Sequence, residues 1–334
     1  MKSSERGAAL LAVLILVAIT GAIAAAALEK LRLSRAVSAN VASLDQARFA
    51  ALGAEQLAML IIDDLITQDR SVTTLAGGWN GATRSIPMPG GGLVEARVRD
   101  GGNCFNINSV VQGDVRSGLG RRPSGVAQFV TLMRLTGVSE AEANRIAEGA
   151  ADWADTDIIV SPGGAEDQAY GQGSPPFMAG NTLFAEVSEL RVLPGMTPAI
   201  YSRIRPHICA LPISDLSPIN VNTLFPHQAL LVAMLSPGAL NEEQVRRVLA
   251  ARPAAGWANN VEFWRSGGFR DVAIPLDAQQ QVKVRTDWFT LDIRSVSGES
   301  EHYETALVDA RLQPARIARR RWERDGADAL PVAR

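Results

Sequence analysis

Hydrophobic residues near the start of the chain form one uninterrupted apolar segment. Residues 8–28 read AALLAVLILVAITGAIAAAAL and contain no charge between Arg6 and Glu29. At ~1.5 Å per residue, a helix of these residues spans the roughly 30 Å hydrocarbon core of a bilayer. We therefore predict one membrane-spanning helix at this end of the chain.

The next segment has the pattern of an amphipathic helix. Between residues 29 and 67 apolar positions recur at intervals of three and four, proline is absent, and Gly53 is the sole glycine. Because no helix-breaking residue separates this segment from the apolar one, we expect a continuous stalk helix roughly 90 Å long.

Alternating apolar and polar residues predict three strands. Residues 71–92 are rich in glycine and proline and predict a loop, and Leu93–Arg99 after it alternates as a strand does. Near the other end, Trp288–Val296 and His302–Leu312 alternate and are joined by Ser297–Ser300, which predicts a hairpin. We expect these strands to form one antiparallel sheet against the stalk helix.

An internal repeat lies between these strands. The segment CFNINS recurs as PINVNT, which puts Asn106 and Asn220 114 positions apart. Each copy precedes a helix, a turn and a second helix, and asparagine, serine and threonine favour helix caps and turns. We predict two related all-helical modules, at 105–210 and 215–285.

Three kinds of N-terminal segment fit the apolar run. A secretory signal peptide would be cleaved near Ala24–Ala27, and a plain anchor would need no leader. A type IV pilin-like signal would be cut after the glycine of a short polar leader, and MKSSERG ends at Gly7. Cleavage there leaves the apolar segment attached to the long helix, so the pattern favours the third kind.

Composition argues against several classes of function. The net charge is −2, so no overall positive field attracts nucleic acid. The two cysteines form no CxxC motif, which argues against zinc, and the three histidines lie in no nucleophile motif such as GxSxG. We therefore expect no enzyme activity.

One loop concentrates negative charge. Between Ile146 and Leu190 there are eight acidic residues and no lysine or arginine. Close carboxylates repel one another, and a hard cation with flexible oxygen coordination, such as Ca²⁺, relieves that repulsion. The alternative is a solvated acidic loop that caps a helix.

The leader, the stalk helix and these motifs resemble the K-type minor pseudopilin family of bacterial type II secretion systems, over essentially the whole chain. In that family a prepilin peptidase cuts after the glycine that matches Gly7 and methylates the new amino terminus, here Ala8. Alanine replaces the commoner phenylalanine at that position.

Most pilin-like proteins have glutamate at the fifth mature position, whereas the K type has an aliphatic residue, here Ala12. A carboxylate buried in a bilayer or filament core needs a partner. A subunit without it makes no such bond to a subunit above and is suited to the filament tip.

The resemblance also bears on the acidic loop and on the fold. DWAD followed by GGAED matches the segment in which the family binds calcium, and the inserted helices resemble sterile-alpha-motif (SAM-like) helices. The implied calcium ligands are Asp155, Asp157, Glu166 and Asp167, with Asp152 as a further candidate.

The two cysteines, Cys104 and Cys209, precede and end the first module. In an oxidising compartment a disulfide between them would close the neck of the insertion. Two separate buried thiols are the alternative, and the sequence leaves both open.

The expected fold is α+β, with a pilin-like long N-terminal helix, a small antiparallel sheet and a large inserted all-α (SAM-like) domain. We expect a prepilin leader at 1–7, a transmembrane helix at 8–28, a periplasmic stalk at 29–67, a sheet region at 68–104 and 286–312, helical modules at 105–210 and 215–285, and a flexible tail at 313–334.

The expected function is to initiate or cap the tip of a type II secretion pseudopilus. The protein would cross the bacterial inner membrane once, hold most of its chain in the periplasm, and join minor pseudopilins of the I and J types. The alternative is a membrane-anchored DNA-binding protein, because PINVNT and Leu193-Pro-Gly-Met-Thr resemble helix-hairpin-helix segments. Few arginines near that turn could contact phosphates, so we expect no nucleic-acid partner.

Overall fold

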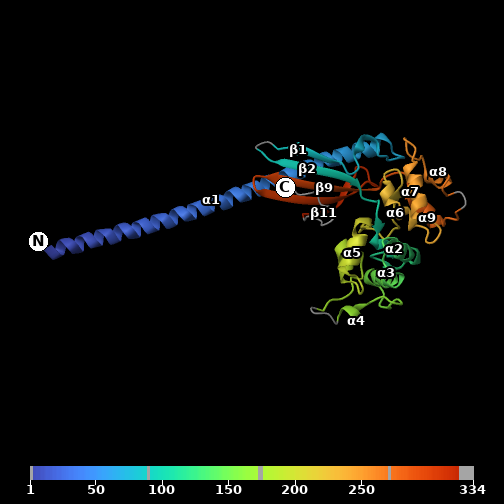
Figure 1. The fold of residues 1–334 in the computed structure, drawn as a ribbon, viewed down its shortest axis with the longest axis horizontal. Helices are drawn as coiled ribbons and strands as arrows, with labels where there is room; N and C mark the ends of the chain where they lie inside the picture. The colour runs from blue at the N-terminus through green and yellow to red at the C-terminus, as the bar shows by residue number, and fades with distance from the viewer. Residues whose placement is uncertain (1–2, 89–90, 172–175, 270–271, 323–334) are drawn as a thin grey trace.

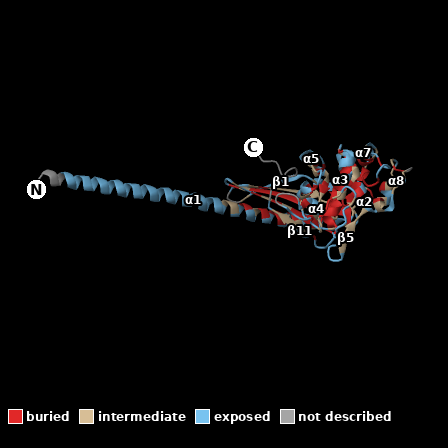
Figure 2. Ribbon diagram, turned by 90° about the horizontal axis from the view of Figure 1, so that it is seen from below, coloured by how far each residue is buried: buried red, intermediate tan, exposed pale blue. Residues whose placement is uncertain are grey.

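The computed structural model describes residues 3–88, 91–171, 176–269 and 272–322, and side chains from Gly7 onward. One helix, α1 (Ser3–Gln68), extends far beyond the rest of the molecule (Figure 1). Its 66 residues span ~100 Å at 1.5 Å per residue. From Gly7 onward the first half of α1 is exposed along its length, while its second half is buried on one side (Figure 2).

The buried side of α1 is a stripe of small and branched residues. It consists of Ala47, Ala51, Ala54, Ala58, Ile62 and Ile66, which recur at the three- and four-residue spacing of one helix face. The alanines let the helix backbone approach the sheet closely. Two clusters of buried residues join this stripe to the central strands.

The sheet has five strands in the order β1-β2-β9-β10-β11, and all neighbours are antiparallel. The three predicted strands are its centre, β2, β9 and β10. The bounds are β1 Thr83–Pro87, β2 Leu93–Asp100, β9 Trp288–Ser297, β10 Ser300–Asp309 and β11 Arg316–Arg321.

The two edge strands correct the sequence prediction. Strand β1 lies in the segment predicted as a loop, and β11 lies in the first part of the predicted flexible tail 313–334, of which residues 323–334 lie outside the described residues. Every residue of β1 is exposed, so its pairing leaves no hydrophobic pattern to detect. In β11, Ile317 packs against the clusters below α1, but four arginines around it hide the alternation.

The insertion lies between β2 and β9 and contains most of the remaining elements (Figure 1). It is mainly helical but not all-helical as predicted, because three two-stranded ladders too short to give a period-two pattern tie its segments together. The helices are α2 Pro123–Leu135, α3 Glu140–Ala154, α4 Asp167–Tyr170, α5 Pro198–Ile204, α6 Leu230–Ala233, α7 Glu242–Ala250, α8 Asn260–Arg265 and α9 Leu276–Gln281. Short 3₁₀ segments are η1 Ala76–Gly78, η2 Ile107–Val110, η3 Val187–Val192, η4 Arg205–His207 and η5 Pro226–Gln228. The short strands are β3 Phe105–Asn106, β4 Val111–Asp114, β5 Gly118–Arg121, β6 Ile208–Cys209, β7 Ile219–Asn220 and β8 Val282–Lys283.

The two copies of the repeat adopt the same structure. In each copy a two-residue strand pairs in parallel with the strand that ends its module, β3 with β6 and β7 with β8. The second asparagine of the first copy, Asn108, bonds both the N–H and the C=O of Phe184. Its counterpart Asn222 does the same to Trp257. A buried side-chain amide thus holds a distant aromatic segment in each module.

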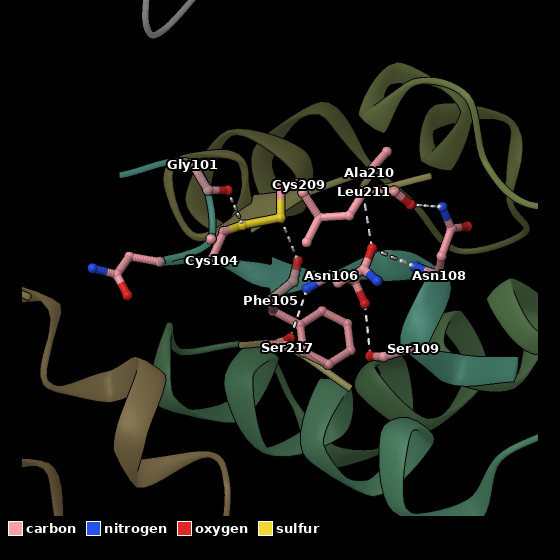
Figure 3. The surroundings of a disulfide bond; sticks show 12 residues. Gly101, Cys104, Phe105, Asn106, Asn108, Ser109, Cys209, Ala210, Leu211 and Ser217 are labelled. Carbon is pink, nitrogen blue, oxygen red and sulfur yellow. Dashed lines mark hydrogen bonds between the residues drawn. A yellow bond between two sulfur atoms is a disulfide. The ribbon is translucent and has the colours of Figure 1, made fainter. Parts of the chain in front are cut away.

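A disulfide closes the neck of the first module. Cys104 and Cys209 are bonded, with their Cα atoms 5.8 Å apart (Figure 3). The bond lies beside the parallel pairing of β3 and β6, where Asn106 also accepts a hydrogen bond from the N–H of Leu211. Hydrogen bonds and a covalent bond therefore fix the same crossing of the chain.

Candidate metal centre

The acidic loop begins where α3 ends. Ser139 caps the start of α3 by accepting a hydrogen bond from the N–H of Glu142. The helix buries its alanine-rich face in the core of the insertion and ends at Ala154, with Asp155 as the C-cap residue. The chain then turns through glycines and returns at Glu166, the residue before α4. Asp155 and Glu166, at the two ends of this loop, therefore lie close together.

Three carboxylates converge at this point. Asp155, Asp157 and Glu166 each place one oxygen within 4.8 Å of the other two. Asp155 and Glu166 are buried, whereas Asp157 is exposed at the mouth of the cluster. A set made only of carboxylate oxygens suits a hard cation such as Ca²⁺ better than zinc, which prefers sulfur and nitrogen.

Several buried oxygens here lack a hydrogen bond. Oδ1 of Asp152, Oδ1 of Asp155 and Oε1 of Glu166 receive none from the part of the chain that the structure describes. A buried carboxylate oxygen without a partner is costly, so these atoms are suited to coordinate a cation.

Burial and mutual repulsion shift the pKa of these groups upward. Desolvation, followed by repulsion from Asp157 and other acids, raises the pKa of Asp155 to about 7. Desolvation and then repulsion from Asp152 raise the pKa of Glu166 to about 7. Near neutral pH the cluster therefore holds protons or needs a cation.

Asp152 lies directly beside the three converging acids. It is fully buried on α3, and its Oδ2 accepts a hydrogen bond from the N–H of Ser161 at 3.0 Å. A Cβ atom on Gly164 would lie 2.0 Å from that same Oδ2. A side chain at position 164 would displace the Asp152 carboxylate, so glycine lets the loop close over it, a role that sequence analysis missed although the Gly-Gly pair is visible.

Asp167 takes a different role in this structure. Its Oδ1 accepts a hydrogen bond from the N–H of Ala179 at 2.8 Å, which ties α4 to the returning chain. It is not among the three residues whose oxygens converge.

An aromatic group lies next to the cluster. Trp153 contacts both Tyr170 and Phe177 edge-on, with ring centroids 5.2 Å and 6.2 Å apart. The nearby cation Arg121 is already engaged in two hydrogen bonds of 2.7 Å to Glu148. Trp153 and Tyr170 belong to the acidic segment itself, whereas no local pattern linked Arg121 to it, because Arg121 reaches the segment only through packing.

The predicted cleavage residues lie in the exposed part of α1. Gly7, Ala8 and Ala12 are all exposed, and nothing approaches within 4 Å of the place where a Cβ on Gly7 would lie. Among the described residues, α1 is the one helix long and apolar enough to cross a membrane.

A long helix with an exposed apolar first half and a second half packed on an antiparallel sheet defines a pilin-like protein. Two family models described as "Type II secretion system (T2SS), protein K" match residues 103–213 and 219–285. These matches follow the two repeated modules.

Relatives match nearly the whole chain. The type II secretion system protein K of Klebsiella pneumoniae is 32% identical over 96% of this chain and 98% of its own length. That of Pectobacterium carotovorum is 30% identical over the same shares. The crystal structure of the GspK-GspI-GspJ complex from enterotoxigenic Escherichia coli contains a chain that matches with a TM-score of 0.73 and 27% identity, over 84% of this chain and 97% of that one.

The chain therefore belongs to the type II secretion system protein K family, and it is a minor pseudopilin. The predicted family and the α+β fold class are confirmed. The matches favour this function over the DNA-binding alternative.

Proposed function

We propose that this minor pseudopilin forms the tip of a type II secretion pseudopilus. The position of the insertion supports this proposal most directly. Both modules lie around the end of α1 away from the N terminus (Figure 1). In a filament built from parallel stalk helices, a bulky domain at that end obstructs a further subunit beyond it.

The N-terminal segment supports the same position. Cleavage by a prepilin peptidase after Gly7 and methylation of Ala8 would put Ala12 at the fifth mature position. An alanine there offers no carboxylate to the amino terminus of a subunit above. The anchor would then hold residues 8–28 in the inner membrane, with the sheet and the modules in the periplasm.

The expected partners are two other minor pseudopilins, by analogy with the complex that its structural relative forms with GspI and GspJ. Co-purification from membranes of cells that carry all three subunits tests this. We expect a complex with one copy of this chain, and amino-terminal sequencing should begin at Ala8. A mature terminus downstream of Ala24 would contradict the proposal, because the stalk would then be detached from the membrane.

We also propose that the acidic cluster binds Ca²⁺. Asp155, Asp157 and Glu166 would hold the ion, and the neighbouring Asp152 would add negative charge, since its carboxylate acts electrostatically on Asp155 and Glu166. The ion would supply positive charge that lets the buried carboxylates stay ionised. Its role is structural: it joins the end of α3 to the start of α4 and thereby fixes the loop.

A further inference from the structure

Exposed apolar side chains border the acidic cluster. Ile158, Ile159 and Val160 are 82%, 74% and 55% exposed, and Met178 is 68% exposed. Outside α1, and within the residues that the structure describes, 158–160 is the one run of three consecutive large apolar residues that is exposed. Single exposed apolar residues are ordinary, whereas a group of them usually marks a contact surface.

The loop holds these side chains at the edge of the cluster. Ile158 directly follows Asp157, and Val160 directly precedes Ser161, whose N–H bonds Asp152. On the other side, Met178 directly precedes Ala179, whose N–H bonds Asp167. We call Ile158, Ile159, Val160 and Met178 the apolar rim. Hydrogen bonds to Asp152 and Asp167 therefore hold the backbone next to Val160 and next to Met178.

The membrane that holds the anchor is far from the apolar rim. Helices α3 and α4 lie near the end of the molecule away from the N-terminal half of α1 (Figure 1). The predicted membrane-spanning segment ends at residue 28, and 40 more residues of α1 follow it, ~60 Å at 1.5 Å per residue. The lipid around the anchor is therefore a poor candidate for contact with the rim.

Charge decides what kind of surface fits. Residues 152–167 contain five acidic residues and no lysine or arginine, so one bound Ca²⁺ leaves this region negative. Anionic lipid headgroups and acidic proteins are repelled by such a surface. A protein surface with an apolar centre and a cationic border complements it in both respects.

We propose that the apolar rim docks onto a folded protein that presents an apolar depression bordered by arginine or lysine. Burial of the isoleucine side chains in such a depression stabilises the contact, and the cationic border sets the orientation. This goes beyond the tip proposal, which concerns assembly through the stalk helix, because it assigns a contact to the inserted module.

Site-specific photo-crosslinking in secreting cells tests the rim. A photoreactive amino acid replaces Ile159 or Met178 in the full chain, and mass spectrometry maps the crosslinked peptide. We expect the same protein partner from both positions, attached at an apolar site with arginine or lysine at its border. The double change Ile158→Ser and Ile159→Ser should reduce crosslinking from Met178 at least fivefold and lower secretion.

Leu276, which is 69% exposed in the second module, is the matched control. A photoreactive residue there should not capture that partner, and Leu276→Ser should leave secretion unchanged. Crosslinks to lipid, to a second copy of this chain or to an acidic protein surface would overturn the proposal, as would equal yields from Ile159 and Leu276. The double variant should still co-purify with the two minor pseudopilins and should melt at the same temperature as the unaltered chain. If the unaltered chain itself does not co-purify with them, that result counts against the tip proposal instead.

Discussion

Arg320 of β11 and Glu55 of α1 form a bidentate ion pair, with Nε and Nη2 of the arginine 2.7 and 2.8 Å from the two carboxylate oxygens. Glu55 is fully buried, and a second buried acid, Glu304 of β10, lies beside it. Burial opposes ionisation of Glu55, but the hydrogen bonds and the positive charge of Arg320 prevail and lower its pKa. The pair joins the stalk helix to the last strand of the sheet.

Removal of Arg320 should therefore loosen the stalk from the sheet. Arg320→Met leaves two buried carboxylates without their cation. Loss of one partner of a buried ion pair lowers the free energy of unfolding by ~3–5 kcal/mol. The loss is smaller here because the arginine is partly exposed. We expect a clear fall in the melting temperature of the detergent-solubilised chain. Arg316→Met on the exposed side of β11 is the control, and equal melting of both variants would contradict the role of the pair.

Chelation should destabilise the first module. Without a cation, repulsion among Asp155, Asp157 and Glu166 is unrelieved, so EDTA should lower the melting temperature and Ca²⁺ should restore it. Asp155→Asn and Glu166→Gln should each weaken Ca²⁺ binding at least tenfold in calorimetry. Glu299→Gln, in the turn between β9 and β10, should bind as the unaltered chain does. Melting that is indifferent to EDTA would rule out a structural ion.

The stability of the metal-free chain should fall as the pH rises through 7. Asp155 and Glu166 have pKa values raised to about 7 in the folded chain, whereas unfolded carboxyls titrate near pH ~4. The folded state thus binds more protons between these values. The stability from this difference is complete below the unfolded pKa and is lost as the pH passes the folded pKa.

Calcium should reverse that trend, because it binds the ionised carboxylates and its affinity rises with pH.

Glu304 also has a pKa raised to about 7, by burial and then by Glu55, and contributes a similar slope of stability against pH. The double variant Asp155→Asn, Glu166→Gln isolates the cluster: chemical denaturation from pH 5 to 8 should show a shallower slope than in the unaltered chain. Identical slopes would exclude the cluster as the source.

Reduction of the disulfide should destabilise the insertion. Cys104 and Cys209 are 105 residues apart, and closure of a loop of that length is worth ~4–5 kcal/mol in the chain-entropy model, commonly less in practice. A mass increase of about two hydrogens on reduction would verify the bond. Cys104→Ser with Cys209→Ser should lower the melting temperature to the same extent as reduction, and thiols that alkylate without prior reduction would disprove the bond.

A methyl group at position 164 should disturb the acidic loop. The Cβ of Gly164→Ala would meet Oδ2 of Asp152 at 2.0 Å, and overpacking of this kind costs ~1–3 kcal/mol. Gly149→Ala in α3 is the matched control, since nothing lies within 4 Å of its Cβ position and alanine favours helix. We expect Gly164→Ala alone to lower both stability and Ca²⁺ affinity.

Much of the architecture could be predicted from local pattern. The apolar run, the helical spacing after it and the alternating segments predicted α1, β2, β9 and β10. Each of these elements buries one face, and its apolar residues recur with the period of a helix or of a strand. The repeat around Asn106 and Asn220 also pointed to two similar modules, since the same residues make the same turns. Strand β1 was missed because all its residues are exposed, and β11 was missed because its arginines hide the alternation of apolar and polar residues.

The sequence by itself determined the long helix with its apolar first half and the presence of an acid-rich loop, because length, periodicity and charge are local properties. Tertiary structure alone decided that Asp155, Asp157 and Glu166 converge while Asp167 bonds a backbone N–H instead. It also decided that Arg320 reaches Glu55, 265 residues earlier in the chain. Such pairings depend on how the sheet and the helices pack, and no local pattern encodes which distant charges that packing brings together.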